Sequence, residues 1–180
     1  MAGLSLESGT NNPKPKKDFG IQVPKHPEIL LRTPDEVLNK QSNNENFVLA
    51  SVRGWKEFSG KYSGYFYIDK IGEPYGATYA EASYNSTDVD GLINSKGELY
   101  NIKHFLKSWE EWGITPDKEV AFYCGSGWRA AVPFFITLSL GWENVSVYEG
   151  GWYLWDKYHD KDPEKYRIQV GNPKEDNNEI

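Results

Sequence analysis

The residues with the clearest chemical potential lie in one turn, residues 124–129, whose sequence is Cys-Gly-Ser-Gly-Trp-Arg. The apolar run 120–123 before the turn is typical of a buried strand, and the apolar stretch 130–140 after it has the length of a helix. The two glycines permit successive amides to point at one centre, and the helix adds the positive end of its dipole. Because these groups stabilise a thiolate, we predict that Cys124 is a nucleophile in an anion-binding loop.

Cys124 is also the only cysteine among 180 residues. The chain therefore forms no intramolecular disulfide, and sulfur bound to Cys124 must pass to an acceptor outside the chain. A lone cysteine at the end of an apolar run is usually a small buried hydrophobe. The glycines and the arginine that follow at loop spacing favour the nucleophile.

Two arginines are the predicted anion ligands. Arg129 stands at a helix N-terminus, where a cation opposes the dipole, so holding an anion over Cys124 would explain its presence. A cap or an ion pair at the start of its helix is the structural alternative. Arg53 ends a predicted parallel strand, where ligands bind in open α/β sheets. A salt bridge that steadies the site explains Arg53 equally well, and Lys61 is a further candidate cation.

The remaining residues of the turn complete the predicted binding site. Gly125 and Gly127 supply backbone amides, Ser126 either donates to the substrate or closes a turn, and Trp128 either flanks the pocket mouth or packs. The histidines show no ligand spacing with the cysteine, so we expect no metal and no other cofactor. They are His26, His104 and His159.

The elements that must position this turn alternate along the chain. We predict a helix from Thr33-Pro34 to residue 38, strands over 47–52 and 120–123, and a helix over 102–112 that ends at Gly113. Alternating strands and helices favour a parallel sheet covered on both faces. Apolar residues have no regular spacing over residues 59–100, so this segment is predicted to be a long irregular excursion from the regular structure. Such a length is typical of functional loops around a site.

The chain resembles the rhodanese-type sulfurtransferases, and the turn 124–129 resembles the active-site loop of their mercaptopyruvate and thiosulfate branch. Three further segments follow the family's order, although Ser51 replaces the usual aspartate; they are 51–53 with Trp55, Glu57 and Phe58, then 72–77, then 145–152 with Trp155. The resemblance implies a single rhodanese-like α/β domain with a central parallel β-sheet and helices on both faces.

Composition sets the remaining expectations. We expect a tail or linker over 1–27, a catalytic domain over 28–170 and a polar tail over 171–180. The net charge of −6 argues against nucleic acid and against an anionic membrane surface as partners. No apolar run is long enough to span a membrane, and no secretory signal is visible, so we expect a cytoplasmic protein.

The resemblance implies transfer of sulfane sulfur from a small anionic donor such as thiosulfate, through a Cys124 persulfide, to a thiol or cyanide. It further implies that Arg53 helps to hold the anionic group of the donor. It is strongest toward the catalytic C-terminal module of tandem enzymes, so a second rhodanese domain or another protein is a candidate partner. The alternative is a persulfide carrier with little turnover. A phosphatase of the same fold is disfavoured, because its loop is one residue longer and a histidine, not Tyr123, precedes its cysteine.

Overall fold

The computed structural model describes residues 9, 10, 20 and 25–175. Most of the predicted tail 1–27 and the second half of the predicted tail 171–180 lie outside the described residues. The first described element is the 3-10 helix η1 (Pro27–Ile29), which adjoins the predicted start of the domain at residue 28.

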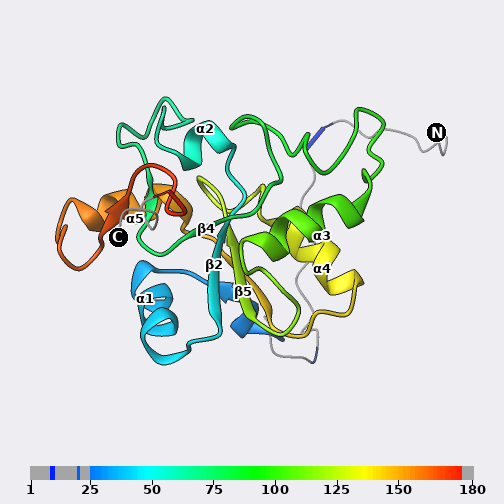
Figure 1. Cartoon of the computed structure of the whole chain (residues 1–180), viewed down its shortest axis with the longest axis horizontal. Coiled ribbons are helices and arrows are strands. Elements are labelled where there is room, and N and C mark those ends of the chain that lie inside the picture. The colour runs from blue at the N-terminus through cyan, green and yellow to red at the C-terminus, as the bar shows by residue number, and fades with distance from the viewer. Residues whose placement is uncertain (1–8, 11–19, 21–24, 176–180) are drawn as a thin grey trace.

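A five-stranded sheet forms the centre of the molecule (Figure 1). Its order is β1 (Leu30–Leu31), β6 (Val145–Tyr148), β5 (Glu119–Tyr123), β2 (Phe47–Ser51) and β4 (Thr78–Tyr79). Every pair of neighbours is parallel. The register of β2 on β5 ends with Ser51 opposite Tyr123. The residues that follow these two central strands therefore leave the same edge of the sheet, as the sequence predicts for Arg53 and Cys124.

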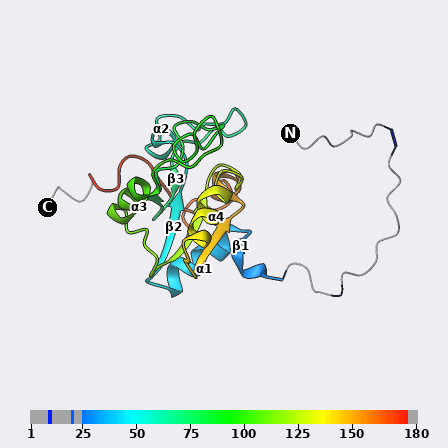
Figure 2. The ribbon, with the colours of Figure 1, turned by 90° about the vertical axis from the view of Figure 1, so that its right-hand side faces the viewer.

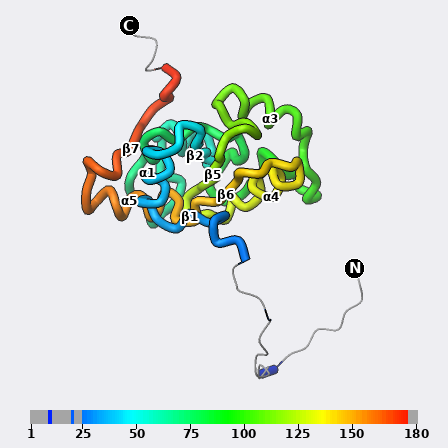
Figure 3. Tube along the Cα trace, turned by 90° about the horizontal axis from the view of Figure 1, so that it is seen from below, coloured from blue at the N-terminus to red at the C-terminus, as the bar shows by residue number. Residues whose placement is uncertain are grey.

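Helices cover both faces of the sheet, which confirms the predicted fold class. One apolar cluster joins Phe105 and Trp109 of α3 (Ile102–Glu111) and Phe134 of α4 (Ala131–Ser139) to one face. The other cluster joins Val37 of α1 (Pro34–Asn43) and Trp152 of α5 (Gly151–His159) to the opposite face. Figure 3 shows the two pairs of helices on either side of the strands. Side chains alternate along the strands, so each central strand contributes to both clusters.

Local sequence signals explain where the longer helices begin and end. Thr33 and Glu36 form a capping box at the start of α1, which continues to Asn43 rather than ending at residue 38. Gly113 follows α3 with a φ of 73°, a left-handed conformation that glycine adopts without steric cost. The predicted ends of α3, α4 and the central strands agree with the structure to within one residue.

The long excursion 59–100 gathers with the short helix α2 (Trp55–Phe58) at the end of the sheet where β2 finishes (Figure 2). It contains little regular structure. Its strand β3 (Glu73–Pro74) pairs antiparallel with β7 (Ile168–Gln169), far along the chain, and β4 joins the edge of the main sheet. The predicted loops thus lie beside the turn that follows β5.

Candidate active site

The turn that holds Cys124 connects the end of β5 to the start of α4, as the sequence predicts. Cys124 is fully buried, and Gly125 and Gly127 are buried beside it. Ser126 and Trp128 lie on the surface, and Trp128 is 49% exposed. The turn therefore has a buried side that contains the sulfur and an outer side that faces solvent.

The N-terminus of α5 fixes the position of this turn. The amide of Trp152 donates to the carbonyl of Cys124, and the amide of Tyr153 donates to that of Gly125, both at 2.9 Å. Gly151 allows the approach, because it has a φ of 57° and a Cβ on it would lie 2.6 Å from both carbonyl oxygens. This glycine therefore supports the turn that holds the candidate nucleophile.

Backbone amides of the turn remain available for an anion. Within the described part of the chain, no amide from Gly125 to Arg129 donates a hydrogen bond. The carbonyls of Gly127, Trp128 and Arg129 accept from the next turn at 3.1 to 3.3 Å, as at a helix N-terminus. Unpartnered amides at such an end can bind an anion, so the geometry is compatible with the anion-binding loop, which stays a prediction.

Arg129 is fully buried and paired with a carboxylate. Its Nη1 and Nη2 atoms donate to the two oxygens of Glu57, each at 3.0 Å. Nη1 also donates to the carbonyl of Asn85 at 2.7 Å, and Nη2 donates to the Tyr65 hydroxyl at 2.6 Å. Only Nε has no partner among the described residues. Glu57 thus neutralises the positive charge of Arg129, which the sequence predicts to hold a bound anion.

Arg53 is buried in the same cluster. Its Nη1 donates to Glu73 at 2.8 Å and its Nε donates to Glu57 at 3.4 Å, while its guanidinium lies 5.4 Å from the centre of the Trp152 ring. This geometry favours the salt bridge that the sequence leaves open as the alternative to anion binding, and it gives Arg129 the same structural role. The sequence does not identify Glu57 and Glu73 as partners of the arginines, because both ion pairs are closed by the packing of the fold. The spacing of Arg53 and Glu57, four residues apart, was the available signal.

The ion cluster extends to the end of β5. Glu73 accepts hydrogen bonds from the hydroxyls of Tyr123 and Ser51, the latter at 3.3 Å. Burial raises the pKa of Glu73 above its ordinary value, although Arg53 and the Tyr123 hydroxyl act in the opposite direction. Ser51 thus donates to the carboxylate of Glu73, a residue of the excursion. The family that the chain resembles usually has an aspartate at the position of Ser51.

Tyr65, which no sequence motif indicates, covers the turn. Its ring occupies the space above Gly125, where a Cβ would overlap the ring, and its hydroxyl accepts from Arg129. Burial and the nearby Cys124 sulfur both raise the pKa of Tyr65 well above its ordinary value. The Ser63 hydroxyl donates to the Tyr65 carbonyl at 2.9 Å, which steadies this part of the loop. Apolar residues have no regular spacing in the excursion, so no sequence pattern indicates which of its residues faces the turn.

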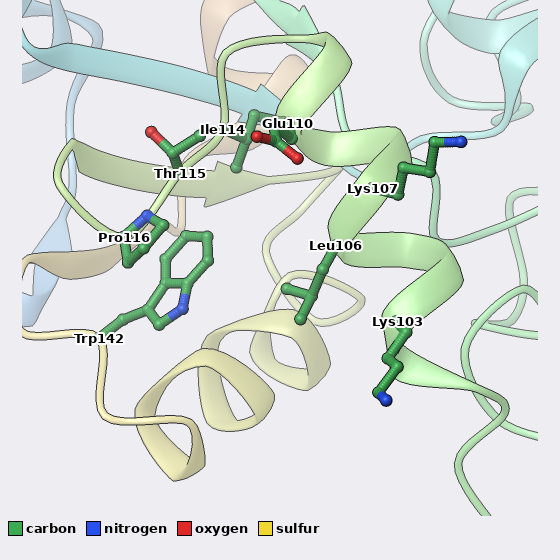
Figure 4. A pocket seen from close by; sticks show the side chains of 8 residues that line it. All are labelled: Lys103, Leu106, Lys107, Glu110, Ile114, Thr115, Pro116 and Trp142. Carbon is green, nitrogen blue, oxygen red and sulfur yellow. The ribbon is translucent and has the colours of Figure 1, made fainter.

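Other predicted features lie away from this cluster. Lys61 is exposed, and its side chain forms no hydrogen bond or ion pair with any residue that the structure describes. A pocket of about 390 Å³ lies between α3 and the residues before β5 and β6, among them Pro116 and Trp142 (Figure 4). Since these residues precede β5 and Cys124 follows it, the pocket is at the other end of that strand. Among the described residues, no group of three His, Cys, Asp or Glu side chains could hold a metal ion. None of the helices described is long and apolar enough to cross a membrane.

Comparisons with known proteins point to one family. A family model described as a rhodanese-like domain matches residues 33–158. The thiosulfate sulfurtransferase YnjE of Escherichia coli (strain K12) is 39% identical over 155 residues, which are 86% of this chain and 35% of that protein. The crystal structure of YnjE matches with a TM-score of 0.78 at 36% identity, over 95% of this chain and 40% of that one. The chain thus spans about a third of the curated relative's length.

A second group of solved structures is that of EanB. One of them contains a cysteine persulfide in a tetrahedral intermediate state with ergothioneine, and it matches with a TM-score of 0.79 at 32% identity, over 96% of this chain and 39% of that one. That variant replaces a tyrosine which precedes the persulfide-bearing cysteine by as many residues as Tyr65 precedes Cys124. Other variants replace a threonine two positions after the cysteine, where this chain has Ser126.

Proposed function

Because the chain belongs to the rhodanese-like domain family, we propose that it transfers sulfane sulfur through a persulfide on Cys124, with thiosulfate as the donor. The observation that supports this most directly is the row of unpartnered amides, from Gly125 to Arg129, that follows the cysteine in the described part of the chain. A sulfurtransferase needs a nucleophilic sulfur beside groups that stabilise negative charge, and this turn supplies both.

The reaction takes place in two steps. The Cys124 thiolate attacks the outer sulfur of thiosulfate, a new S–S bond forms on Cys124, and the S–S bond of the donor breaks so that sulfite leaves with the electron pair. A nucleophilic acceptor, cyanide in an assay or a thiol in the cell, then attacks the outer sulfur of the persulfide. The Cys124 thiolate leaves and is ready for another cycle. The amides of the turn stabilise the negative charge as it moves between donor and enzyme.

The arginines act on this reaction by positioning the surrounding loops. Arg53 donates to the carbonyls of Gly72 and Ser63, at 2.7 and 2.6 Å, and Arg129 donates to the carbonyl of Asn85 at 2.7 Å. All three carbonyls belong to the excursion that covers the end of the sheet. The two buried arginines therefore hold this irregular segment against the turn.

We expect thiosulfate to be preferred over 3-mercaptopyruvate. In the mercaptopyruvate enzymes that the chain resembles, the serine matching Ser126 works with a histidine and an aspartate of a preceding domain. In this structure Ser126 is exposed, and no side chain among the described residues is its partner. The bulky Trp128 beside it also favours a compact dianion.

Parallel assays of the two donors at matched concentrations, with cyanide as the acceptor, test this preference. We expect the higher kcat/KM for thiosulfate. A kcat/KM for 3-mercaptopyruvate well above that for thiosulfate would contradict the donor assignment without affecting the role of Cys124. Sulfur uptake by Cys124 without turnover on either donor would instead favour a persulfide carrier.

The EanB variants favour a second candidate for the acceptor. The matching separations of Tyr65 and Ser126 from the cysteine suggest hercynine as a substrate to be tested. Transfer would replace the C–H bond of the imidazole by a C–S bond, and the displaced proton would balance the released Cys124 thiolate. Incubation of the persulfide-loaded chain with hercynine, followed by mass analysis for ergothioneine, tests this acceptor. Absence of the product under conditions where cyanide accepts sulfur would exclude it.

A further inference from the structure

Tyr65 has a hydroxyl group whose hydrogen is not used by the described part of the protein. The oxygen accepts a hydrogen bond from Arg129 Nη2 at 2.6 Å, which uses one of its lone pairs. A guanidinium nitrogen is a donor only, so the Tyr65 hydrogen cannot return to Arg129. Among the residues that the structure describes, the Tyr65 hydroxyl donates to no other group. Its hydrogen is therefore free to meet an acceptor near the turn.

We consider the sulfur of Cys124 as the acceptor of this hydrogen, because a Cβ on Gly125, the next residue, would lie 2.4 Å from the Tyr65 hydroxyl oxygen. In the described structure the hydroxyl and the sulfur are not yet hydrogen-bonded. The Tyr65 ring lies against Gly125, the residue after the cysteine. A negative charge on Cys124 acts to raise the pKa of both Tyr65 and Arg129. Since burial and this sulfur raise the pKa of Tyr65, the hydroxyl keeps its proton throughout the ordinary pH range. A protonated hydroxyl beside a sulfur anion is a hydrogen-bond donor.

We propose that Tyr65 is a catalytic residue whose hydroxyl donates a hydrogen bond to the anionic sulfur on Cys124, first the thiolate and then the outer sulfur of the persulfide. This inference rests on the proposed function, because it concerns the sulfur that Cys124 transfers. Arg129 polarises the hydroxyl, and Glu57 orients Arg129 through its two 3.0 Å contacts. Arg129 thereby acts on the sulfur through Tyr65 and not as a direct ligand of the substrate.

The test compares Tyr65→Phe with wild type in two measurements. The first is the pH dependence of the thiolate ultraviolet absorbance, corrected with the same profile of Cys124→Ser. We expect the thiolate to appear at higher pH in Tyr65→Phe. The second is the rate of persulfide formation at saturating thiosulfate, which we expect to fall about tenfold to a hundredfold, the loss typical of a hydrogen bond to a charged group.

Tyr67→Phe is the matched control. Its ring lies 5.3 Å from that of Tyr65, but the residue is exposed and no contact with Arg129 is described for its hydroxyl. We expect it to behave as wild type in both measurements. Unfolding midpoints of both variants establish that the fold is kept.

An unchanged thiolate profile in Tyr65→Phe would overturn the proposal even if the rate fell, because a role of the ring in packing would lower the rate without moving the profile. A shifted profile with an unchanged loading rate would also overturn the catalytic role. The profile requires no sulfur donor. Failure of wild type to take up sulfur would therefore count against the proposed function and remain distinct from failure of the Tyr65 hydrogen bond.

Discussion

At the scale of single residues, the site depends on a buried cluster in which two arginines balance two glutamates. Arg53, Arg129, Glu57 and Glu73 all have no exposed surface. Burying an unpaired charge is costly, whereas a buried pair with good hydrogen bonds offsets most of the cost of removing both ions from water. The cluster therefore persists only as a complete set, and each member depends on the others.

Arg129→Met should destabilise the protein because it leaves Glu57 with only part of its charge compensation. Removal of one partner from a buried ion pair costs about 3 to 5 kcal/mol, so we expect a loss of that order in the free energy of unfolding, measured with urea. Lys61→Met is the control, because it removes an exposed cation and should change the free energy of unfolding by less than about 0.5 kcal/mol. An Arg129→Met variant with wild-type stability but a raised, salt-dependent KM for thiosulfate would support direct anion binding instead.

The sequence could indicate the candidate nucleophile and the turn around it but not the partners of the arginines. Cys124 and its glycines are adjacent in the chain, so their spacing alone predicts the anion-binding loop. Glu57, Glu73 and Tyr65 reach the loop from segments 50 or more residues away, through an excursion without periodicity. Such contacts depend on tertiary packing, which local patterns do not specify.

At the scale of elements, the N-terminus of α5 holds the turn from the side opposite α4. The amides of Trp152 and Tyr153 use the carbonyls of the turn and leave its own amides unpartnered among the described residues. Gly151 permits this contact through its conformation and its lack of a side chain. A helix and a strand end thus cooperate to keep the amides of the turn oriented toward one side.

Gly151→Ala tests this support, with Gly141→Ala as its control. Both glycines have positive φ, 57° and 83°, so alanine strains the backbone at each by about 1 to 2 kcal/mol. Only Gly151 would bring a Cβ against the turn, whereas a Cβ on Gly141 meets nothing within 4 Å. We expect Gly151→Ala to lower the rate of persulfide formation about tenfold to a hundredfold, because small displacements of reacting groups are costly. Equal rates for the two variants would show that α5 does not position the nucleophile.

The longer elements could be predicted because each has a regular apolar pattern. The strands β2 and β5 and the helices α3 and α4 agree with expectation to within a residue or so at their ends. The pair formed by β3 and β7 could not be predicted, because each strand has two residues and the two are far apart in the chain. The four-residue helix α2 is likewise too short to show a period.

At the scale of the whole molecule, one parallel sheet brings the residues after β2 and β5 to a single edge and buries an apolar cluster on each face. The net charge of −6 means that an anionic donor must be attracted locally. Because glutamates neutralise the arginines, we expect the amides of the turn and the N-terminus of α4 to supply that attraction. We therefore propose that the chemistry takes place at this turn.

The central claim is that Cys124 accepts the transferred sulfur, and intact mass after incubation with thiosulfate tests it most directly. Because Cys124 is the only cysteine, we expect wild type to gain the mass of one sulfur atom and to lose it when cyanide is added. Cys124→Ser should show no gain under the same conditions. An unmodified wild-type mass, or a sulfur adduct that persists in Cys124→Ser, would contradict the account.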